Sequence, residues 1–122
     1  MGAVNGLVIK RDGVPTLYWV GDSIWCDEVR AAIDQHQPDV TVVHACGAHW
    51  KDRGPLVMNE AHVEALLRHA DRATVVATHM DCVDHATVSR ADLRRHFGAR
   101  PTLMARLQVP ADGQTLSFAA RA

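Results

Sequence analysis

The strongest constraint on the fold is an order of strand, loop and helix that occurs three times along the chain. Short apolar runs rich in β-branched residues alternate with segments whose apolar residues recur at helical spacing. The expected strands are residues 16–20, 40–43 and 73–78, and the expected helices are residues 26–35, a segment after Asn59 and a segment after Ser89. Strands that alternate with helices pair in parallel through right-handed crossovers, so this order predicts an α/β fold (α+β in some schemes).

Turn signals near both ends of the sequence add hairpins to this plan. Asp12-Gly13 follows the apolar residues 7–10 and precedes strand 16–20, which is typical of a hairpin. A second hairpin is expected near the end of the chain, with strands at residues 102–109 and 115–118 around a turn at 110–113. We therefore expect a mixed sheet with antiparallel strands at its margins.

Local signals mark where two of the helices begin and where one ends. Asn59 is the expected N-cap of the second helix. Ser89 is the expected N-cap of the third, with Asp92 completing a capping box. Gly98 is the expected residue just beyond the end of that helix.

Length and composition limit the classes of protein that the chain can represent. With 122 residues it suits one domain, residues 1–122, with enough apolar residues (48%) for a core. A formal net charge of −1 argues against nucleic-acid binding and against binding to an anionic membrane. No apolar run is long enough to span a bilayer and no secretory signal is recognisable, so the expected location is the cytoplasm. Cys26, Cys46 and Cys82 form no CxxC motif and are expected to stay reduced.

The expected parallel strands bring metal-ligating residue types to one edge of the sheet. Ligands of such sheets bind beyond the carboxyl ends of the strands. Asp22, residues 44–50 and His79 leave those ends here. Asp22 has the chemistry of an oxygen ligand for zinc, iron or manganese, but a carboxylate in a turn also caps nearby backbone amides. His79 is either a ligand or a histidine satisfied by a backbone carbonyl.

The other histidines and acids near this edge are weaker candidates on spacing alone. His44 and His49 flank a glycine-containing loop, where a hydrogen-bonded loop histidine is the simpler interpretation. Further donors follow His79 in a local cluster, consisting of Asp81, Cys82, Asp84 and His85. The sequence contains no Gly-x-Ser-x-Gly elbow, phosphate-binding glycine-rich loop or HExxH helix, so those enzyme classes are set aside.

Taken together, these residues resemble a known family. The stretch Thr16-Leu17-Tyr18-Trp19-Val20-Gly21-Asp22-Ser23-Ile24-Trp25 looks like the Gly-Asp-Thr segment of metallo-β-lactamase-fold hydrolases, most similar to the branch of the ascorbate-6-phosphate lactonase-like proteins. Other residues that carry the resemblance are Pro38-Asp39-Val40, Gly47-Ala48, Met58, Ala77-Thr78-His79-Met80, His85 and Val88-Ser89-Arg90-Ala91-Asp92-Leu93-Arg94. The order and spacing agree over roughly residues 5–118. The resemblance implies half of an αββα sandwich, with a mixed sheet and helices mainly on one face.

The resemblance also implies a metal centre and a reaction. The Asp of the Gly-Asp motif bridges two metal ions, usually zinc, and a late strand-end His binds the second ion, which assigns these roles to Asp22 and His79. Iron or manganese is the alternative to zinc. The metal would lower the pKa of a water to near 7, making hydroxide available to attack a small-molecule substrate. His49 or His85 would be an additional ligand.

The chain departs from the family because it contains no His-x-His-x-Asp-His motif, which supplies most of the ligands. It therefore looks like the C-terminal half alone, and we expect an uncovered apolar sheet face. A homodimer or a complementary N-terminal-half chain would cover that face. Two functional hypotheses follow. The first is an incomplete metal-dependent hydrolase, and the second is an inert truncated scaffold or interaction module without the metal centre.

Overall fold

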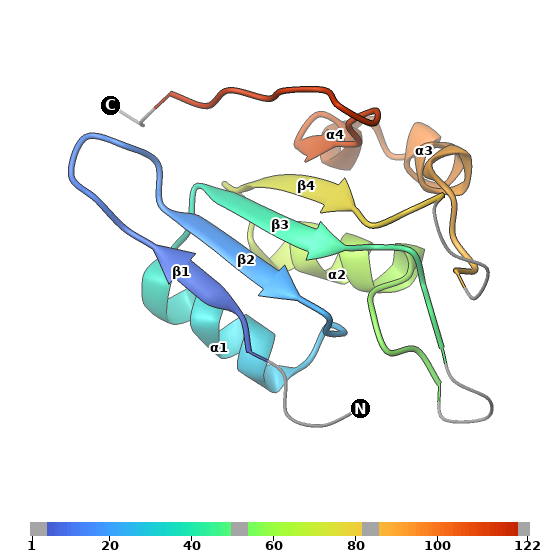
Figure 1. Cartoon of the computed structure of the whole chain (residues 1–122), viewed down its shortest axis with the longest axis horizontal. Helices are drawn as coiled ribbons and strands as arrows, with labels where there is room; N and C mark the ends of the chain where they lie inside the picture. The colour runs from blue at the N-terminus through green and yellow to red at the C-terminus, as the bar shows by residue number, and fades with distance from the viewer. Residues whose placement is uncertain (1–4, 50–53, 82–85, 120–122) are drawn as a thin grey trace.

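A computed structural model of the chain describes residues 5–49, 54–81 and 86–119. The strands are β1 (Leu7–Ile9), β2 (Leu17–Gly21), β3 (Val40–His44), β4 (Thr74–Thr78) and β5 (Leu107–Gln108). The helices are α1 (Asp27–His36), α2 (Glu60–His69), α3 (Arg90–Gly98) and the short α4 (Pro101–Met104). Figure 1 shows the strands side by side in one sheet, with α1 and α2 behind it.

Within the described residues the strands form a mixed sheet in the order β1-β2-β3-β4-β5. β1 pairs antiparallel with β2, and the remaining neighbours pair in parallel. In the centre of the sheet, Val42 pairs with Val76 and His44 pairs with Thr78, so β3 and β4 end at the same level. The expected α/β fold with a mixed sheet is confirmed.

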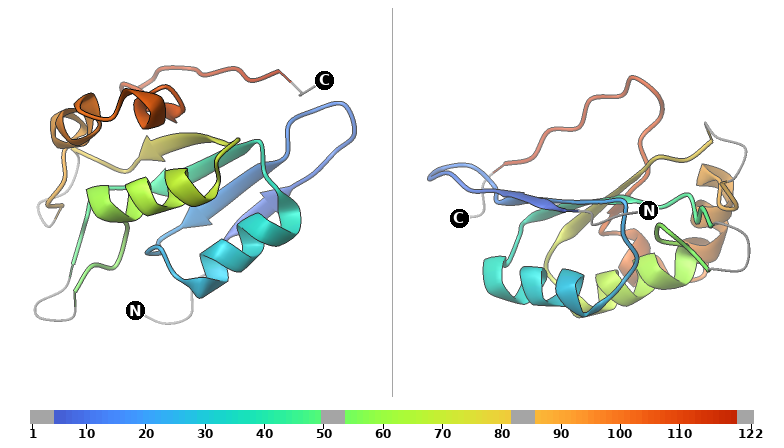
Figure 2. Two further views of the ribbon diagram at one scale, coloured as in Figure 1. Left: turned by 180° about the vertical axis from the view of Figure 1, so that it is seen from behind. Right: turned by 60° about the horizontal axis from the view of Figure 1, so that its bottom comes forward.

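The core lies between the sheet and the helices on one of its faces. Figure 2 shows α1 and α2 together on that face, as right-handed crossovers between successive parallel strands require. Side chains that alternate along each strand supply the sheet's half of this core. The largest fully buried side chains are Phe97, Met58, Leu66, Leu67, Leu93, Val43, Val63 and Val75. The prediction that the helices lie mainly on one face of the sheet is therefore also confirmed.

The helix starts agree with the sequence, and one helix end does not. Asn59 accepts a hydrogen bond from the backbone N–H of His62, and Ser89 accepts one from the backbone N–H of Asp92. The prediction that Gly98 lies beyond α3 is wrong, because α3 includes Gly98 and its C-cap is Ala99 with φ −87°. The backbone N–H of Arg100 donates to Phe97, so the chain turns directly toward α4 without a left-handed residue.

The predicted hairpin near the end of the chain is also wrong. Pro101 begins α4, where a proline at the first helical position loses no hydrogen bond. The following strand, β5, is only two residues long and pairs in parallel with β4. Residues 109–119 form no strand, and Leu116 packs against valines of β3 and β4 instead of continuing a ladder.

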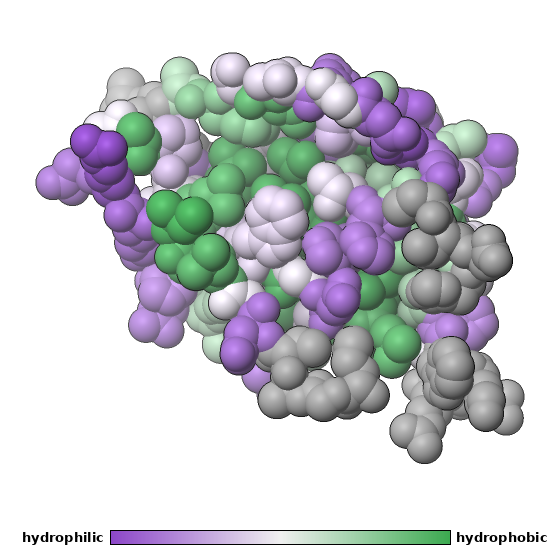
Figure 3. Space-filling view, viewed as in Figure 1, coloured by the Kyte–Doolittle hydropathy of each residue, from purple (hydrophilic) through white to green (hydrophobic). Residues whose placement is uncertain are grey.

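The sheet face opposite α1 and α2 is apolar and only partly covered, because Leu116 packs against its buried valines whereas residues of β1 and β2 stay exposed. We call it the open sheet face; its residues are Leu7, Ile9, Leu17, Trp19, Val40, Val42 and Val76. Leu7, Ile9 and Trp19 are each exposed over 44% or more of their surface. Figure 3 shows hydrophobic residues gathered over the strands on this side, with hydrophilic residues around them. Among the described residues, no helix is long and apolar enough to cross a membrane.

Candidate metal centre

Three residues with metal-ligating side chains meet at the carboxyl edge of the parallel strands. Asp22 follows β2, His44 is the last residue of β3, and His79 follows β4. One ligand atom from each lies within 4.8 Å of the other two. Because bonds of about 2.0–2.2 Å place two ligands of one ion at most about 4.4 Å apart, these atoms are near the separation that a single ion requires.

Backbone geometry directs Asp22 and His79 toward this point. Gly21 has φ 78° and its position coincides with a register shift between β2 and β3, so the chain turns sharply just before Asp22. His79 has φ 73°, a left-handed conformation that is uncommon and costly for a residue with a Cβ. Such conformations concentrate at functional sites, where the surrounding structure maintains them.

Direct contacts connect the three side chains. The Nδ1 atom of His44 lies 2.6 Å from Oδ1 of Asp22. The rings of His44 and His79 are stacked, with centroids 4.4 Å apart and planes 13° from parallel. The His44 side chain is only 15% exposed, whereas that of Asp22 is 46% exposed. The cluster therefore has a buried middle and an accessible rim.

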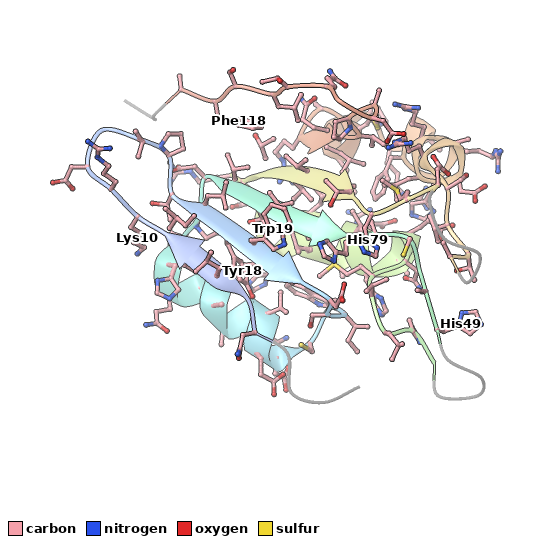
Figure 4. The ribbon with its side chains drawn as sticks, viewed as in Figure 1. Lys10, Tyr18, Trp19, His49, His79 and Phe118 are labelled. Carbon is pink, nitrogen blue, oxygen red and sulfur yellow. The ribbon has the colours of Figure 1, made fainter. Side chains whose placement is uncertain are left out.

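A buried cysteine and an exposed tryptophan border the cluster. The Sγ atom of Cys46, which is fully buried, lies 3.6 Å from Nδ1 of His79. Trp19 packs edge-on against the ring of His44, with centroids 6.0 Å apart. Figure 4 shows Trp19 over the sheet and His79 beyond the strand ends on the same side of the molecule. The cluster thus lies where the open sheet face meets the carboxyl edge of the sheet.

The loop after β3 is held tightly around Cys46. The backbone carbonyl of Cys46 accepts hydrogen bonds from the backbone N–H groups of Thr87 and Val88, at 2.8 and 2.9 Å. Gly47 has φ 64°, and a Cβ there would lie 2.6 Å from Oγ1 of Thr87. This close approach explains why the loop has a glycine beside Cys46.

The other candidate residues lie elsewhere or outside the described residues. His49 is exposed, forms an isolated bridge with Pro55 and lies apart from His79 in Figure 4. Asp81 contacts Arg90 at the start of α3. His85, Cys82 and Asp84 lie outside the described residues. Cys26 and Cys46 form no disulfide within the described part of the chain.

Sequence reasoning placed His44 at this edge but did not select it as a ligand. The fully apolar, β-branched run at residues 40–43 predicts a buried strand but does not indicate which of its side chains face the helices. In the structure Val40, Val42 and His44 alternate onto the open sheet face. The alternation of side chains along a strand was the signal that could have identified His44.

Comparison with known proteins shows that the chain is similar in sequence and fold to solved hydrolases. The chain is 33% identical over 118 residues to the UPF0173 protein YddR of Bacillus subtilis (strain 168), matching 97% of this chain and 46% of that protein. It superposes on the crystal structure of an isothiocyanate hydrolase from Delia radicum gut bacteria with a TM-score of 0.88 and 30% identity, over 94% of this chain and 44% of that one. The chain therefore spans about half the length of the relatives it matches.

Two further solved structures are also similar to the chain. A possible metal-dependent hydrolase from Veillonella parvula DSM 2008 gives a TM-score of 0.87 and 26% identity, over 93% of this chain and 43% of that chain. A metallo hydrolase from the hyperthermophilic archaeon Ignicoccus hospitalis shares the fold, with a TM-score of 0.74 and 19% identity over 98% of this chain and 48% of that chain. The chain has the fold of half a metallo-β-lactamase-type hydrolase. No protein-family profile matches it.

The residues at this edge of the sheet suit a metal ion. Two histidines and a carboxylate are the donor set of several catalytic zinc sites and of non-haem iron sites. In the chain these donors come together without help from any other segment. A metal therefore fits the Asp22–His44–His79 cluster on the chemistry of its ligands and on their proximity.

Proposed function

We propose that this chain is the C-terminal, metal-binding half of a metallo-β-lactamase-fold hydrolase, and that Asp22 and His79 are metal ligands. The observation that carries the proposal is the convergence of Asp22, His44 and His79 at the carboxyl edge of the sheet. The similarity to metal-dependent hydrolases over more than nine tenths of the chain supports it. Zinc is the metal that we propose first, with iron or manganese as alternatives.

The proposed reaction is hydrolysis at an electrophilic carbon or phosphorus atom of a small molecule. A bound divalent ion supplies an acidified water and polarises the oxygen of the group under attack. The chain's own residues hold and orient the ion, because Asp22 and His79 emerge from rigid strand ends. Trp19 adds an apolar surface beside His44, which lies between them.

A complementary half is required to complete the proposed enzyme. The chain contains no His-x-His-x-Asp-His motif, and it spans about half the length of its relatives. The open sheet face would be covered by a second layer of a sandwich, carried on the same or on a separate polypeptide. Covering Trp19 and the strand residues beside it would exclude water from the metal centre and strengthen electrostatic interactions within it.

The open sheet face also favours a second candidate function. An apolar surface of this kind is typical of an interaction module, and it would serve that role without any metal. In that case the cluster of Asp22, His44 and His79 would be a hydrogen-bonded group that stabilises the strand ends. The two candidates differ in whether the purified chain binds metal.

Metal analysis of the purified chain separates them. The hydrolase proposal predicts near-stoichiometric zinc, iron or manganese in the wild type and its loss in Asp22→Ala, with His36→Ala as a control far from the cluster. A folded wild-type chain that takes up no metal, with stability unaffected by chelator, would favour the interaction module. Reaction with esters, lactones, β-lactams, phosphodiesters and isothiocyanates, with and without the complementary half, would then define the substrate class. The isothiocyanate is included because one structural relative is an isothiocyanate hydrolase.

A further inference from the structure

We propose that His44 is the third protein ligand of the metal, so that this chain binds one ion without a complementary half. The inference rests on the metal site proposed above. Catalytic zinc is usually held by three protein ligands. Asp22 and His79 supply two, and a chain with only these two would depend on another segment for stable binding.

The sheet register places His44 beside both proposed ligands. It pairs with Thr78, the residue immediately before His79. Its strand also lies next to β2, which ends just before Asp22. His44 is therefore at the centre of the three adjacent parallel strand ends, between the carboxylate on one side and the imidazole on the other.

The contacts of His44 hold its side chain in position, as a ligand of a preorganised site requires. Its Nδ1 atom approaches Oδ1 of Asp22 at 2.6 Å, and its ring stacks on that of His79. Trp19 and its own strand restrict the ring, since the side chain is only 15% exposed. A ring confined in this way loses little conformational entropy when an ion binds, which favours a preorganised site.

His44 differs from His49, the third ligand considered from the sequence, in all of these respects. The side chain of His49 is exposed on a loop, and His49 belongs to no group of three or more described His, Cys, Asp or Glu side chains that could hold an ion. The two histidines are only five residues apart, so they form a matched pair for a test. Substituting either removes one imidazole from the same region of the chain.

The test measures zinc binding by the 122-residue chain with Zn²⁺ alone. Isothermal titration gives affinity and stoichiometry, and X-ray absorption spectroscopy counts imidazole ligands per zinc. The variants are His44→Asn, His44→Ala and His49→Ala, with Asp22→Ala as a reference. Circular dichroism and thermal melting in EDTA check that each variant folds.

We expect one zinc per wild-type chain with two imidazole ligands. Both His44 variants should bind zinc more than about 100-fold more weakly than the wild type. Losing a residue that only contacts a ligand weakens metal binding by roughly 10–100-fold, so a larger loss indicates that a ligand itself is gone. Their residual zinc should show one imidazole, and His49→Ala should match the wild type.

The other outcomes overturn the inference in distinguishable ways. If His44→Asn keeps two imidazoles and an affinity within tenfold of the wild type, His44 is not a ligand, while the proposed site at Asp22 and His79 remains. If only His49→Ala loses an imidazole, the third ligand is His49. If the folded wild-type chain binds no zinc, the proposed metal site fails together with the inference.

Discussion

At the scale of single residues, Cys46 contacts the proposed ligand His79, and we expect this contact to orient its ring. Its buried sulfur lies 3.6 Å from Nδ1 of His79, a contact that leaves the other ring nitrogen for an ion. Outer contacts of this kind fix the tautomer and ring orientation of metal-binding histidines. His79 needs such support because its backbone is in the left-handed region.

We predict that Cys46→Ala weakens zinc binding by about 10–100-fold while the chain remains folded. The reason is loss of orientation at His79, since no proposed ligand is removed. Cys26→Ala is the matched control, because Cys26 is the other cysteine in the described part of the chain and lies at the start of α1. Isothermal titration measures both, and equal affinity of Cys46→Ala and wild type would contradict the assigned role.

His62 is a pH-dependent residue outside the proposed ligand set. Burial lowers the pKa of His62 below its ordinary value of 6.5. Its Nδ1 atom accepts the backbone N–H of Asn59 at 3.3 Å, which requires the neutral ring. The ring of His62 therefore binds a proton more readily in the unfolded chain than in the folded one. The stability that neutral His62 contributes is present above about pH 6.5. It is lost as the pH falls through the lower pKa that His62 has in the folded state.

We predict that this loss disappears in His62→Gln. Glutamine keeps a side chain suited to the capping box but does not titrate. Urea unfolding at pH 7.5 and 5.5 should show that wild type loses more free energy of unfolding than His62→Gln does over this interval. A difference between the two proteins that is independent of pH would contradict the prediction.

At the scale of elements, the predictions from sequence succeeded where a strong period and a cap agree. The helix starts at Asn59 and Ser89 were correct, because a side-chain oxygen there satisfies backbone N–H groups that would otherwise be unpaired. The tail failed because apolar spacing in a short segment does not reveal which surface it packs on. Leu103 and Leu107 are buried in the core, whereas Leu116 packs against the open sheet face.

The cap of α3 gives a prediction at this scale. Ser89→Ala should lower the free energy of unfolding by about 1 kcal/mol, because it removes the acceptor for the backbone N–H of Asp92. Ser117→Ala, an exposed serine in the tail, should change it little. Urea unfolding measures both variants, and equal effects would show that the α3 cap contributes no special stability.

At the scale of the whole molecule, the open sheet face is the main surface without a full covering layer. The sequence indicated it only through the family resemblance, because alternation within short, largely apolar strands does not say which face is covered. Leu7, Ile9 and Trp19 remain exposed on it. Apolar residues that are contiguous and exposed are typical of an interface.

We predict that the isolated chain associates through this face at micromolar concentration, as a homodimer or with a complementary half. Ile9→Glu should shift the chain toward monomer, because association would bury a charge within the interface. Ala31→Glu, on the exposed side of α1, is the control. Sedimentation equilibrium measures the mass, and a compact wild-type monomer that binds no complementary half would exclude the predicted interface.

The central claim, that an aspartate and histidines from separate strand ends hold one metal ion, is tested most directly by anomalous diffraction. Crystals of the chain grown with Zn²⁺ should give a peak above the zinc absorption edge within about 2.0–2.2 Å of a ligand atom of both Asp22 and His79. A zinc peak located elsewhere, or no peak while the Asp22–His44 hydrogen bond remains intact, would contradict the claim.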